Sequence, residues 1–259
     1  MSRLNGKWVI VTGASSGFGA AIARAFAREG ANLLLGARRE QKVQKLAEEC
    51  KALGNIETFA CYLDVSKTES VTGFLDFVKS KTSSVHILVN NAGGAHGLDF
   101  VADARDEDWE AMFQTNVLGV LRMTRATLPL MPHHSGSYII NIGSIAGHVA
   151  YEGGSAYCAA KAGERKITQA LRLELSGTGI RVSSIDPGLA ETEFSLVRFK
   201  GDEARAKKVY EGTEPLTAED IAETVVWVAN RPPHVNIDEM IIKPTDQAAV
   251  HKVHRRKTV

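Results

Sequence analysis

The sequence predicts a single α/β domain in which a doubly wound parallel sheet carries helices on both faces. Short apolar runs that read as buried strands alternate with amphipathic helical stretches. Glycine and polar clusters follow these runs, at the strand ends where such folds bind their ligands. The chain has 259 residues, is 44% hydrophobic and contains no repeat or low-complexity linker. Residues 1–259 are therefore expected to form one domain with a full hydrophobic core.

Composition also limits the compartment and the partners. A formal net charge of +1 gives no overall field that would favour nucleic acid or an anionic membrane. The three cysteines are scattered and odd in number, and the eight histidines show no metal-ligand spacing. No signal-peptide pattern opens the chain, and no apolar run is long enough to span a bilayer. We therefore expect a soluble cytoplasmic protein without a metal site, a nucleic-acid partner or a membrane partner.

A glycine-rich turn joins the first predicted strand, 7–12, to the first predicted helix, 20–28. Its glycines, at positions 13, 17 and 19, allow a tight turn and a close backbone approach to phosphate, and the helix start adds partial positive charge. The spacing is Gly-x-x-x-Gly-x-Gly, and no Lys-Ser/Thr pair follows, so the turn is not a Walker P-loop. The turn therefore predicts a dinucleotide site, although a purely packing role is the alternative.

Two arginines follow the second predicted strand, 31–35. An NAD-specific enzyme usually places an acidic residue there, for the ribose 2′-hydroxyl. Arg38 and Arg39 instead suit a 2′-phosphate, through forked, charge-assisted hydrogen bonds. They could also lie on the solvated face of helix 41–53, but cations at a helix start are slightly unfavourable. The pair therefore favours NADP(H).

The third and fourth strands also end in polar clusters. Strand 58–63 ends at Asp64, which could accept a hydrogen bond from an adenine amino group or cap the helix that begins near Thr68. Helix 70–79 leads to strand 85–89, which is followed by Asn-Asn-Ala-Gly-Gly. Four strands that alternate with helices predict parallel βαβ units.

A phenol and an ammonium group lie one helical turn apart further along the chain. Tyr157 and Lys161 are four residues apart in the predicted helix 155–175, so both side chains leave the same face. A neighbouring ammonium favours the phenolate and lowers the pKa of a phenol from about 10 toward neutral pH, which suits acid–base catalysis. Ser144 follows the predicted buried strand 138–142, and its hydroxyl could meet this helix face across a cleft. Taken alone, such a pair is more often a solvated lysine beside a half-buried tyrosine.

Taken together and in order, these motifs resemble the short-chain dehydrogenase/reductase family over nearly the whole chain. The resemblance implies a single Rossmann domain with about seven parallel strands, an NADP-dependent oxidoreductase, and a homotetramer or a dimer. The motifs that carry it are Thr12-Gly13 to Gly19, Asn90-Asn91-Ala92-Gly93, Asn116, Ser144, Tyr157 with Lys161, and Pro187-Gly188.

The resemblance implies a catalytic role for four residues. Tyr157 would act as the general acid and base on the substrate oxygen, and Ser144 would hold that oxygen by a hydrogen bond. Lys161 would favour the phenolate and bind the nicotinamide ribose. Asn116, within the predicted helices 106–131, would position a water that links Lys161 to solvent.

The resemblance also implies which residues bind the cofactor. They belong to the glycine-rich turn, the ends of the second to fourth strands, the catalytic helix and the segment after strand 180–185. These positions are Gly13, Ser15, Gly17, Phe18, Gly19, Arg38, Arg39, Asp64, Val65, Asn90, Asn91, Ala92, Gly93, Tyr157, Lys161, Pro187, Gly188 and Thr192.

Residues 188–215 should form a lid that helps to select the substrate. The lid resembles that of the NADP-dependent 3-hydroxy acid (serine) dehydrogenase branch, which implies oxidation of serine, allo-threonine or 3-hydroxyisobutyrate-like acids. Arg198 or Lys200 would then bind the substrate carboxylate, unless both pair on the surface with Asp202 and Glu203. A reductase of larger carbonyls (3-oxoacyl thioesters, steroids or xenobiotic ketones) is the alternative, and a catalytically silent NADP(H) sensor is the third reading.

The remaining features are expected to be structural. Cys158 is interpreted as a small packing residue, and His96 and His148 as ordinary loop histidines rather than pocket residues. A helix is expected over 216–230 and a last strand over 240–242. The basic tail, 248–259, is expected to be disordered, with packing on a neighbouring subunit as the alternative.

Overall fold

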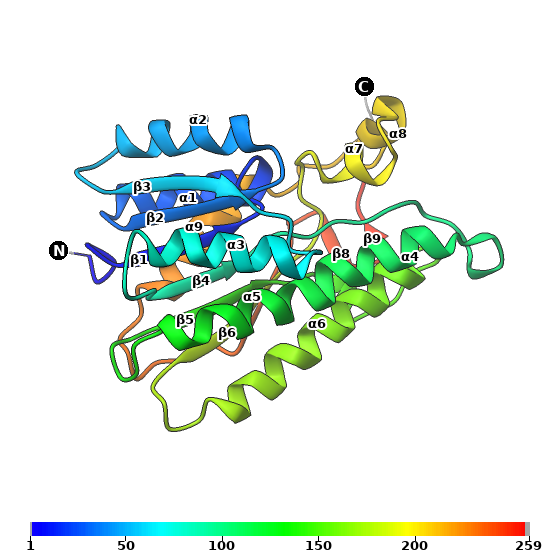
Figure 1. The fold of residues 1–259 in the computed structure, drawn as a ribbon. Coiled ribbons are helices and arrows are strands. Elements are labelled where there is room, and N and C mark those ends of the chain that lie inside the picture. Colours follow the sequence, from blue (N-terminus) through cyan, green and yellow to red (C-terminus); the bar gives the residue numbers. More distant parts are fainter. Residues whose placement is uncertain (1, 257–259) are drawn as a thin grey trace.

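Seven parallel strands form the central sheet of the computed structural model, which describes residues 2–256. Their order is β3-β2-β1-β4-β5-β6-β7 (Figure 1). The chain crosses over after β3, so the sheet grows in both directions from β1, as the predicted doubly wound topology requires. The strands are β1 (Trp8–Thr12), β2 (Asn32–Ala37), β3 (Thr58–Tyr62), β4 (Ile87–Asn90), β5 (Tyr138–Ile142), β6 (Arg181–Pro187) and β7 (Glu239–Ile242).

Helices cover both faces of the sheet, and each face has its own hydrophobic core. On one face, α1 (Gly17–Arg28), α2 (Glu40–Lys51) and α9 (Ala218–Ala229) pack on alternate strand residues such as Val9 and Val11. On the other face, α3 (Thr68–Lys79), α5 (Gly119–Thr127) and α6 (Ser155–Glu174) pack on the intervening residues, such as Ile10. Strands β1, β2, β4 and β5 are buried almost throughout, which explains why their sequences are mainly apolar rather than alternating.

The helical stretch predicted over 106–131 is interrupted at its centre. α4 (Asp106–Phe113) continues through a π-helical turn, Gln114–Leu118, into α5. Such turns occur frequently at functional sites because they change the direction of side chains and carbonyls within a helix. The π-helical turn places Asn116 at the carboxyl end of the sheet, beside α6, as the site requires.

The lid and the segment before α4 lie beyond the carboxyl ends of the strands (Figure 1). The lid contains two short helices, α7 (Phe194–Arg198) and α8 (Glu203–Lys208). Two main-chain hydrogen bonds join the start of the lid to Leu216, just after its end. The amide of Glu191 donates to the carbonyl of Leu216, and the amide of Leu216 donates to the carbonyl of Leu189.

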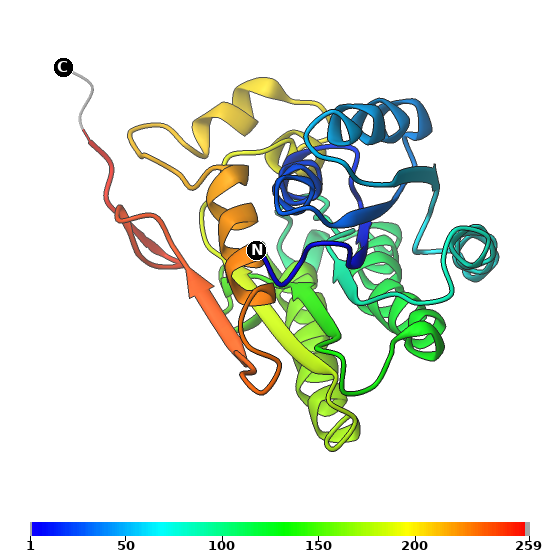
Figure 2. The ribbon, with the colours of Figure 1, turned by 90° about the vertical axis from the view of Figure 1, so that its left-hand side faces the viewer.

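The expectation of a disordered tail is wrong for the described residues up to 256. Strands β8 (Gln247–Ala249) and β9 (Lys252–Val253) form a small antiparallel hairpin after β7 (Figure 2). The guanidinium of Arg255 donates to the carbonyls of Val209 and Glu211, and the Arg256 amide donates to the carbonyl of Gly212. The tail's basic side chains therefore hold the end of the protein's own lid, and positions 257–259 lie outside the described residues.

No helix within residues 2–256 is both long and apolar enough to cross a lipid bilayer. All three cysteines are free thiols, and Cys50 and Cys158 are buried.

Candidate active site

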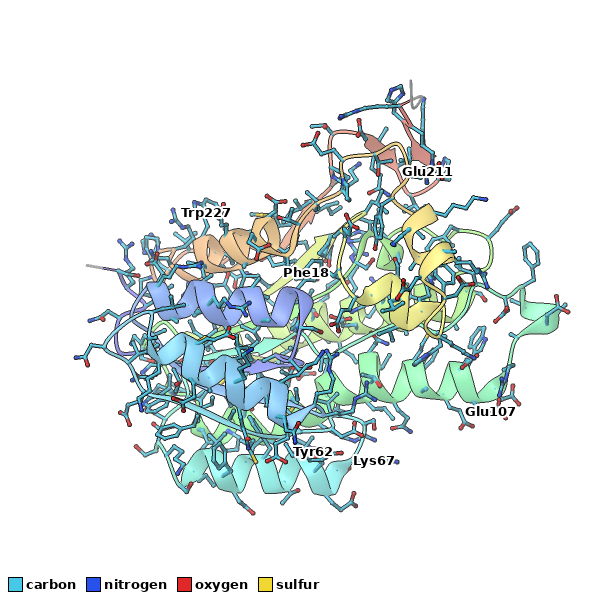
Figure 3. The ribbon with its side chains drawn as sticks, turned by 90° about the horizontal axis from the view of Figure 1, so that it is seen from above. Phe18, Tyr62, Lys67, Glu107, Glu211 and Trp227 are labelled. Carbon is cyan, nitrogen blue, oxygen red and sulfur yellow. The ribbon has the colours of Figure 1, made fainter. Side chains whose placement is uncertain are left out.

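A cavity of about 970 Å³ opens where the strands end. The turns after β1 to β6 line its floor, and the lid covers it. Figure 3 shows Phe18 at the end of α1 that faces the lid helices. The cavity brings together most of the predicted site residues, although they are far apart in sequence. The predicted residues that line it are Gly13, Ser15, Gly17, Phe18, Arg38, Arg39, Asp64, Val65, Asn91, Ala92, Gly93, Ser144, Tyr157, Lys161, Pro187, Gly188, Thr192 and Arg198.

The glycine-rich turn is built for close contact with a ligand. Gly13 and Gly17 have φ angles of 65° and 51°, in the left-handed region that side chains rarely adopt. A Cβ atom on Gly13 would lie 2.9 Å from the Cα of Ala92, so a side chain would close the gap between the turn and the end of β4. The side-chain amide of Asn91 donates to the carbonyls of Thr12 and Gly13 and fixes the turn in place. A phosphate could therefore approach a fixed backbone at the start of α1.

The two arginines predicted to bind a 2′-phosphate have different surroundings. The guanidinium of Arg39 donates to the hydroxyls of Ser15 and Ser16, and its Nη1 lies 2.7 Å from the Glu193 carboxylate of the lid. Partial burial raises the pKa of the Glu193 carboxyl, but hydrogen bonds from Arg39 and Ser16 and the charges of Arg39 and Lys42 outweigh it, so the pKa lies below its usual value. Within residues 2–256, the Arg38 guanidinium has no hydrogen bond or ion pair. The Arg39–Glu193 pair, which sequence reasoning missed, links the phosphate turn to the lid.

Tyr157, Lys161 and Ser144 all line the cavity. Tyr157 and Lys161 lie on the buried face of α6, as their spacing predicts. Ser144 follows β5 directly, and its hydroxyl accepts a hydrogen bond from the Ala146 amide at 3.1 Å, which caps the next helical turn. The Lys161 ammonium donates to the carbonyl of Ile142, at the end of β5, at 2.8 Å. The sheet and α6 together therefore fix the lysine beneath the cavity.

Glu164, which the sequence reasoning did not single out, is the second partner of Lys161. Its Oε2 lies 2.6 Å from Nζ, and both side chains are buried. Burial lowers the pKa of the Lys161 ammonium, but Glu164, Tyr157 and Asp186 outweigh this effect, so the pKa is raised. Burial raises the pKa of the Glu164 carboxyl, and the Lys161 ammonium opposes this rise by favouring the carboxylate.

Asn116 does not line the cavity but lies directly behind it. Its side-chain amide donates to the carbonyls of Gly94 and Met112, and its Oδ1 accepts from the Gly94 amide. A Cβ atom on Gly93 would lie 2.6 Å from the Asn116 Oδ1 and 3.7 Å from the Lys161 Nζ, so only glycine fits between them. The side chain is thus engaged in holding the loop after β4.

The two lid cations predicted to bind a carboxylate have separate environments. The Arg198 guanidinium lines the cavity 5.5 Å from the centre of the Tyr157 ring, and it donates to the Tyr151 hydroxyl and the Gly97 carbonyl. Lys200 does not line the cavity, and its ammonium pairs with the Asp108 carboxylate at 2.9 Å. The alternative partners, Asp202 and Glu203, bind neither cation; Asp202 caps α8 instead.

Two predicted cofactor residues do not line the cavity. The Asn90 side chain is buried and donates to Thr124 and Asn141, so it links β4 to its neighbours in the core. Gly19 lies one turn inside α1, where a Cβ atom would come 2.5 Å from Asn91 and from the Gly13 carbonyl. Both residues therefore support the glycine-rich turn and the sheet from behind. Asp64 does line the cavity, and its Oδ1 accepts from Ser66 rather than from the first turn of α3.

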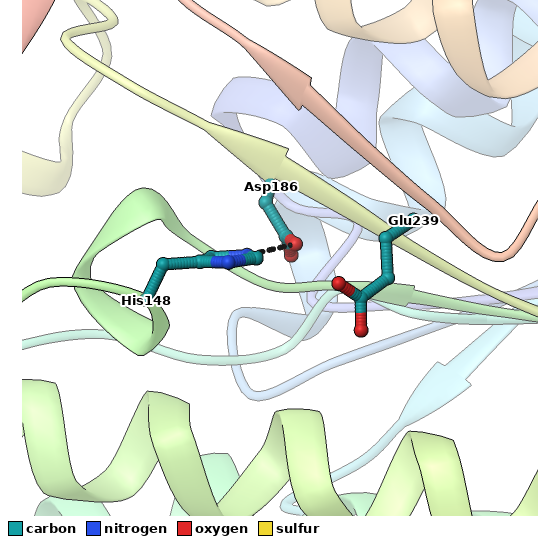
Figure 4. A group of neighbouring side chains, drawn as sticks. All are labelled: His148, Asp186 and Glu239. Carbon is teal, nitrogen blue, oxygen red and sulfur yellow. Dashed lines mark hydrogen bonds and ion pairs between the residues drawn. The ribbon is translucent and has the colours of Figure 1, made fainter.

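His148, Asp186 and Glu239 form a partly buried histidine–carboxylate cluster (Figure 4). His148 Nε2 lies 2.7 Å from the Asp186 carboxylate, and Glu239 is close to both. Arg165 and Gln169 donate hydrogen bonds to the Glu239 oxygens, so the cluster is a hydrogen-bonded network, and no metal is assigned to it.

His96 borders a much smaller cavity of about 20 Å³. Cys158 is buried, and the pKa of its thiol is raised because burial disfavours the thiolate.

The family model described as short chain dehydrogenase matches residues 7–202. The chain belongs to this family. A Schizosaccharomyces pombe relative described as NADP-dependent 3-hydroxy acid dehydrogenase is 42% identical, over 99% of this chain and 100% of the relative. A Chromohalobacter salexigens relative, sulfoacetaldehyde reductase 2, is 42% identical over 93% of this chain and 95% of its own length.

Among solved structures, the closed form of serine dehydrogenase complexed with NADP+ superposes with a TM-score of 0.88 at 42% identity. It covers 96% of this chain and 100% of that one. The short-chain dehydrogenase fold thus extends over the sheet, α6 and the lid described above.

Proposed function

We propose that this short-chain dehydrogenase transfers a hydride between NADP and the 3-position of small 3-hydroxy acids, or their 3-oxo counterparts. The observation that carries this proposal is the position of Arg198, a fixed cation beside the Tyr157 ring inside the cavity. A cation that close to an acid–base group suits a substrate whose carboxylate lies a few bonds from the reacting carbon. The relatives named for 3-hydroxy acids and the serine dehydrogenase structure support the same substrate class.

The residues at the mouth of the cavity fit a phosphorylated dinucleotide. Gly13 and Gly17 would approach the pyrophosphate, and Thr192 and Pro187-Gly188 would meet the nicotinamide end. Arg38 has no protein partner within residues 2–256 and lines the cavity, so it would bind the 2′-phosphate. Bound NADP would accept the hydride from the alcohol carbon, and NADPH would return it.

This chain's own residues would move the proton and hold the substrate oxygen. In oxidation, the Tyr157 phenolate removes the hydroxyl proton while the Ser144 hydroxyl donates a hydrogen bond to the same oxygen. The Lys161 ammonium stabilises the phenolate from below. Because the Asn116 side chain already binds the Gly94 loop, a water link to Lys161 would use the main chain of the π-helical turn.

A substrate panel tests the proposal. We expect NADP-dependent oxidation of serine, allo-threonine or 3-hydroxyisobutyrate to exceed NADPH-dependent reduction of a hydrophobic ketone at least tenfold in kcat/KM. The panel should include 2-sulfoethanol-type sulfonates, because Arg198 can pair with any small anion and one relative is named for sulfoacetaldehyde. Preference for the hydrophobic ketone would overturn the substrate class.

The two arginines give a prediction about the cofactor. Replacing both (Arg38→Ala with Arg39→Ala) should raise the KM for NADP about 10- to 100-fold more than the KM for NAD, because charge-assisted hydrogen bonds to the 2′-phosphate are lost. Arg38→Ala alone should account for most of this selectivity, whereas Arg39→Ala, which also frees Glu193, should affect both cofactors. Lys42→Ala controls for loss of a nearby surface cation. Equal effects of Arg38→Ala on both cofactors would refute the assignment.

We also propose that the enzyme works in the cytoplasm as a homotetramer or a dimer. Its free cysteines suit a reducing compartment. Leu121 on α5 and Leu173 on α6 are exposed side chains on neighbouring helices, which suits a helix-to-helix interface between subunits.

A further inference from the structure

The catalytic face of α6 carries a third polar side chain, Glu164, that the proposed reaction does not yet use. Tyr157, Lys161 and Glu164 occupy positions i, i+4 and i+7, so the three side chains lie on one face of the helix. Glu164 is 1% exposed, and its Oε2 lies 2.6 Å from the Lys161 ammonium. The lysine that supports Tyr157 therefore has a buried carboxylate as its counter-ion.

The second carboxylate oxygen of Glu164, Oε1, makes this arrangement unfavourable for the stability of the fold. Oε1 is buried and has no hydrogen-bond partner within residues 2–256. A buried polar atom without a partner destabilises the fold, and removing a carboxylate from water adds a further cost. An apolar side chain at position 164 would avoid the unpartnered oxygen but would leave the buried Lys161 ammonium without its counter-ion. Packing alone does not account for a carboxylate at this position.

The charges around Glu164 come from three elements. Lys161 and Tyr157 lie on the same helix, Asp186 faces them from β6, and His148, in the turn after Ser144, binds the far side of Asp186. Thr168 donates to the Glu164 carbonyl and accepts from Asn141 of β5, which fixes this turn of α6 to the sheet. The carboxylate is therefore held rigidly against Lys161.

We propose that Glu164 is a positioning residue for Lys161: it fixes the ammonium beneath the cavity and, by compensating its charge, sets the pH range in which Tyr157 can act as a base. This inference rests on the proposed roles of Tyr157 and Lys161. An uncompensated ammonium favours the phenolate strongly, whereas an ammonium paired with a carboxylate favours it less. Oxidation should accordingly begin at higher pH in this chain than in a variant without the carboxylate.

Glu164→Gln tests this role because it keeps the size and an oxygen acceptor but removes the charge. For the holoenzyme, we expect the acidic limb of log kcat/KM against pH, in the oxidation direction, to move down by about one pH unit. Glu164→Leu should move the limb in the same direction, and Glu164→Asp, which keeps the charge, should restore a limb close to that of the wild type. Glu239→Gln is the matched control, because Glu239 binds α6 through Arg165 and Gln169 but does not touch Lys161.

A second readout needs neither cofactor nor turnover. The tyrosinate absorbance of the apoenzyme, taken as the difference between each protein and its Tyr157→Phe counterpart, should appear at lower pH in Glu164→Gln than in the wild type. Glu164→Gln could instead lower activity or thermal stability while the acidic limb of the pH profile and the pH at which the tyrosinate absorbance appears both stay as in the wild type. That result would mean a structural role only, and would overturn the inference. Full activity of Tyr157→Phe would instead overturn the proposed function, so the two failures are distinguishable.

Discussion

Tyr157→Phe is expected to lower kcat about a thousandfold, because it removes only the oxygen that exchanges a proton with the substrate. Loss of a positioned general acid or base costs about 10²–10⁴ in rate. The ring contacts with Phe194 and the buried position on α6 do not depend on the hydroxyl, so the fold should be preserved. Turnover is measured by NADPH absorbance and cofactor affinity by NADPH fluorescence, and the affinity should change less than about threefold.

Tyr151→Phe provides the comparison for that experiment. Tyr151 is a second phenol on the same cavity, and its hydroxyl accepts a hydrogen bond from Arg198. We expect a loss of less than about tenfold, as is typical of a single hydrogen bond to a charged group. A loss below about tenfold in both variants would show that the Tyr157 hydroxyl contributes a hydrogen bond rather than proton transfer.

Arg198→Met should raise the KM for 3-hydroxyisobutyrate about 10- to 100-fold and leave a neutral ketone substrate nearly unaffected. The substitution keeps an unbranched apolar side chain of similar reach but removes the cation that would pair with the carboxylate. Arg198 also donates hydrogen bonds to the Gly97 carbonyl and the Tyr151 hydroxyl, so their loss could loosen the lid. A loosened lid would weaken the binding of both substrates alike. The difference between the two substrates therefore isolates the charge.

Lys200→Met is the matched control for Arg198→Met. Lys200 lies two residues further along the lid, is 53% exposed, and pairs with Asp108 outside the cavity. An exposed ion pair of this kind contributes less than about 1 kcal/mol. We expect a change in KM below threefold, and an equal effect of the two substitutions would contradict the assignment of the carboxylate to Arg198.

Most of the fold could be predicted from the sequence because its signals are local. The strand predicted over 138–142 is observed as β5 with the same ends, since four of its five residues are apolar or strand-forming and the run is bounded by Ser137 and Gly143. The π-helical turn at Gln114–Leu118 could not be predicted, because its sequence fits an ordinary amphipathic helix. The β8–β9 hairpin could not be predicted either, since Arg255, just after it, binds backbone carbonyls of the lid, and such contacts leave no pattern in the sequence.

The candidate site likewise contains residues that could be predicted from the sequence and residues that could not. Tyr157, Lys161 and the glycine-rich turn could be predicted because each motif lies within one element. The Arg39–Glu193 pair joins residues 154 positions apart, and only the folded lid brings them together. The spacing of Glu164 from Lys161 predicts that the two side chains are neighbours on the helix, but whether that face is buried depends on how α6 packs on the sheet.

Transfer of deuterium from the 3-position of the substrate to the cofactor tests the central claim most directly. Incubation of the enzyme with NADP and 3-deuterated serine or 3-hydroxyisobutyrate, followed by mass spectrometry of the reduced cofactor, should yield NADPH that carries one deuterium. The Tyr157→Phe variant should form almost none in the same time. Reduced cofactor without deuterium, or deuterium released to water, would contradict hydride transfer from the 3-position.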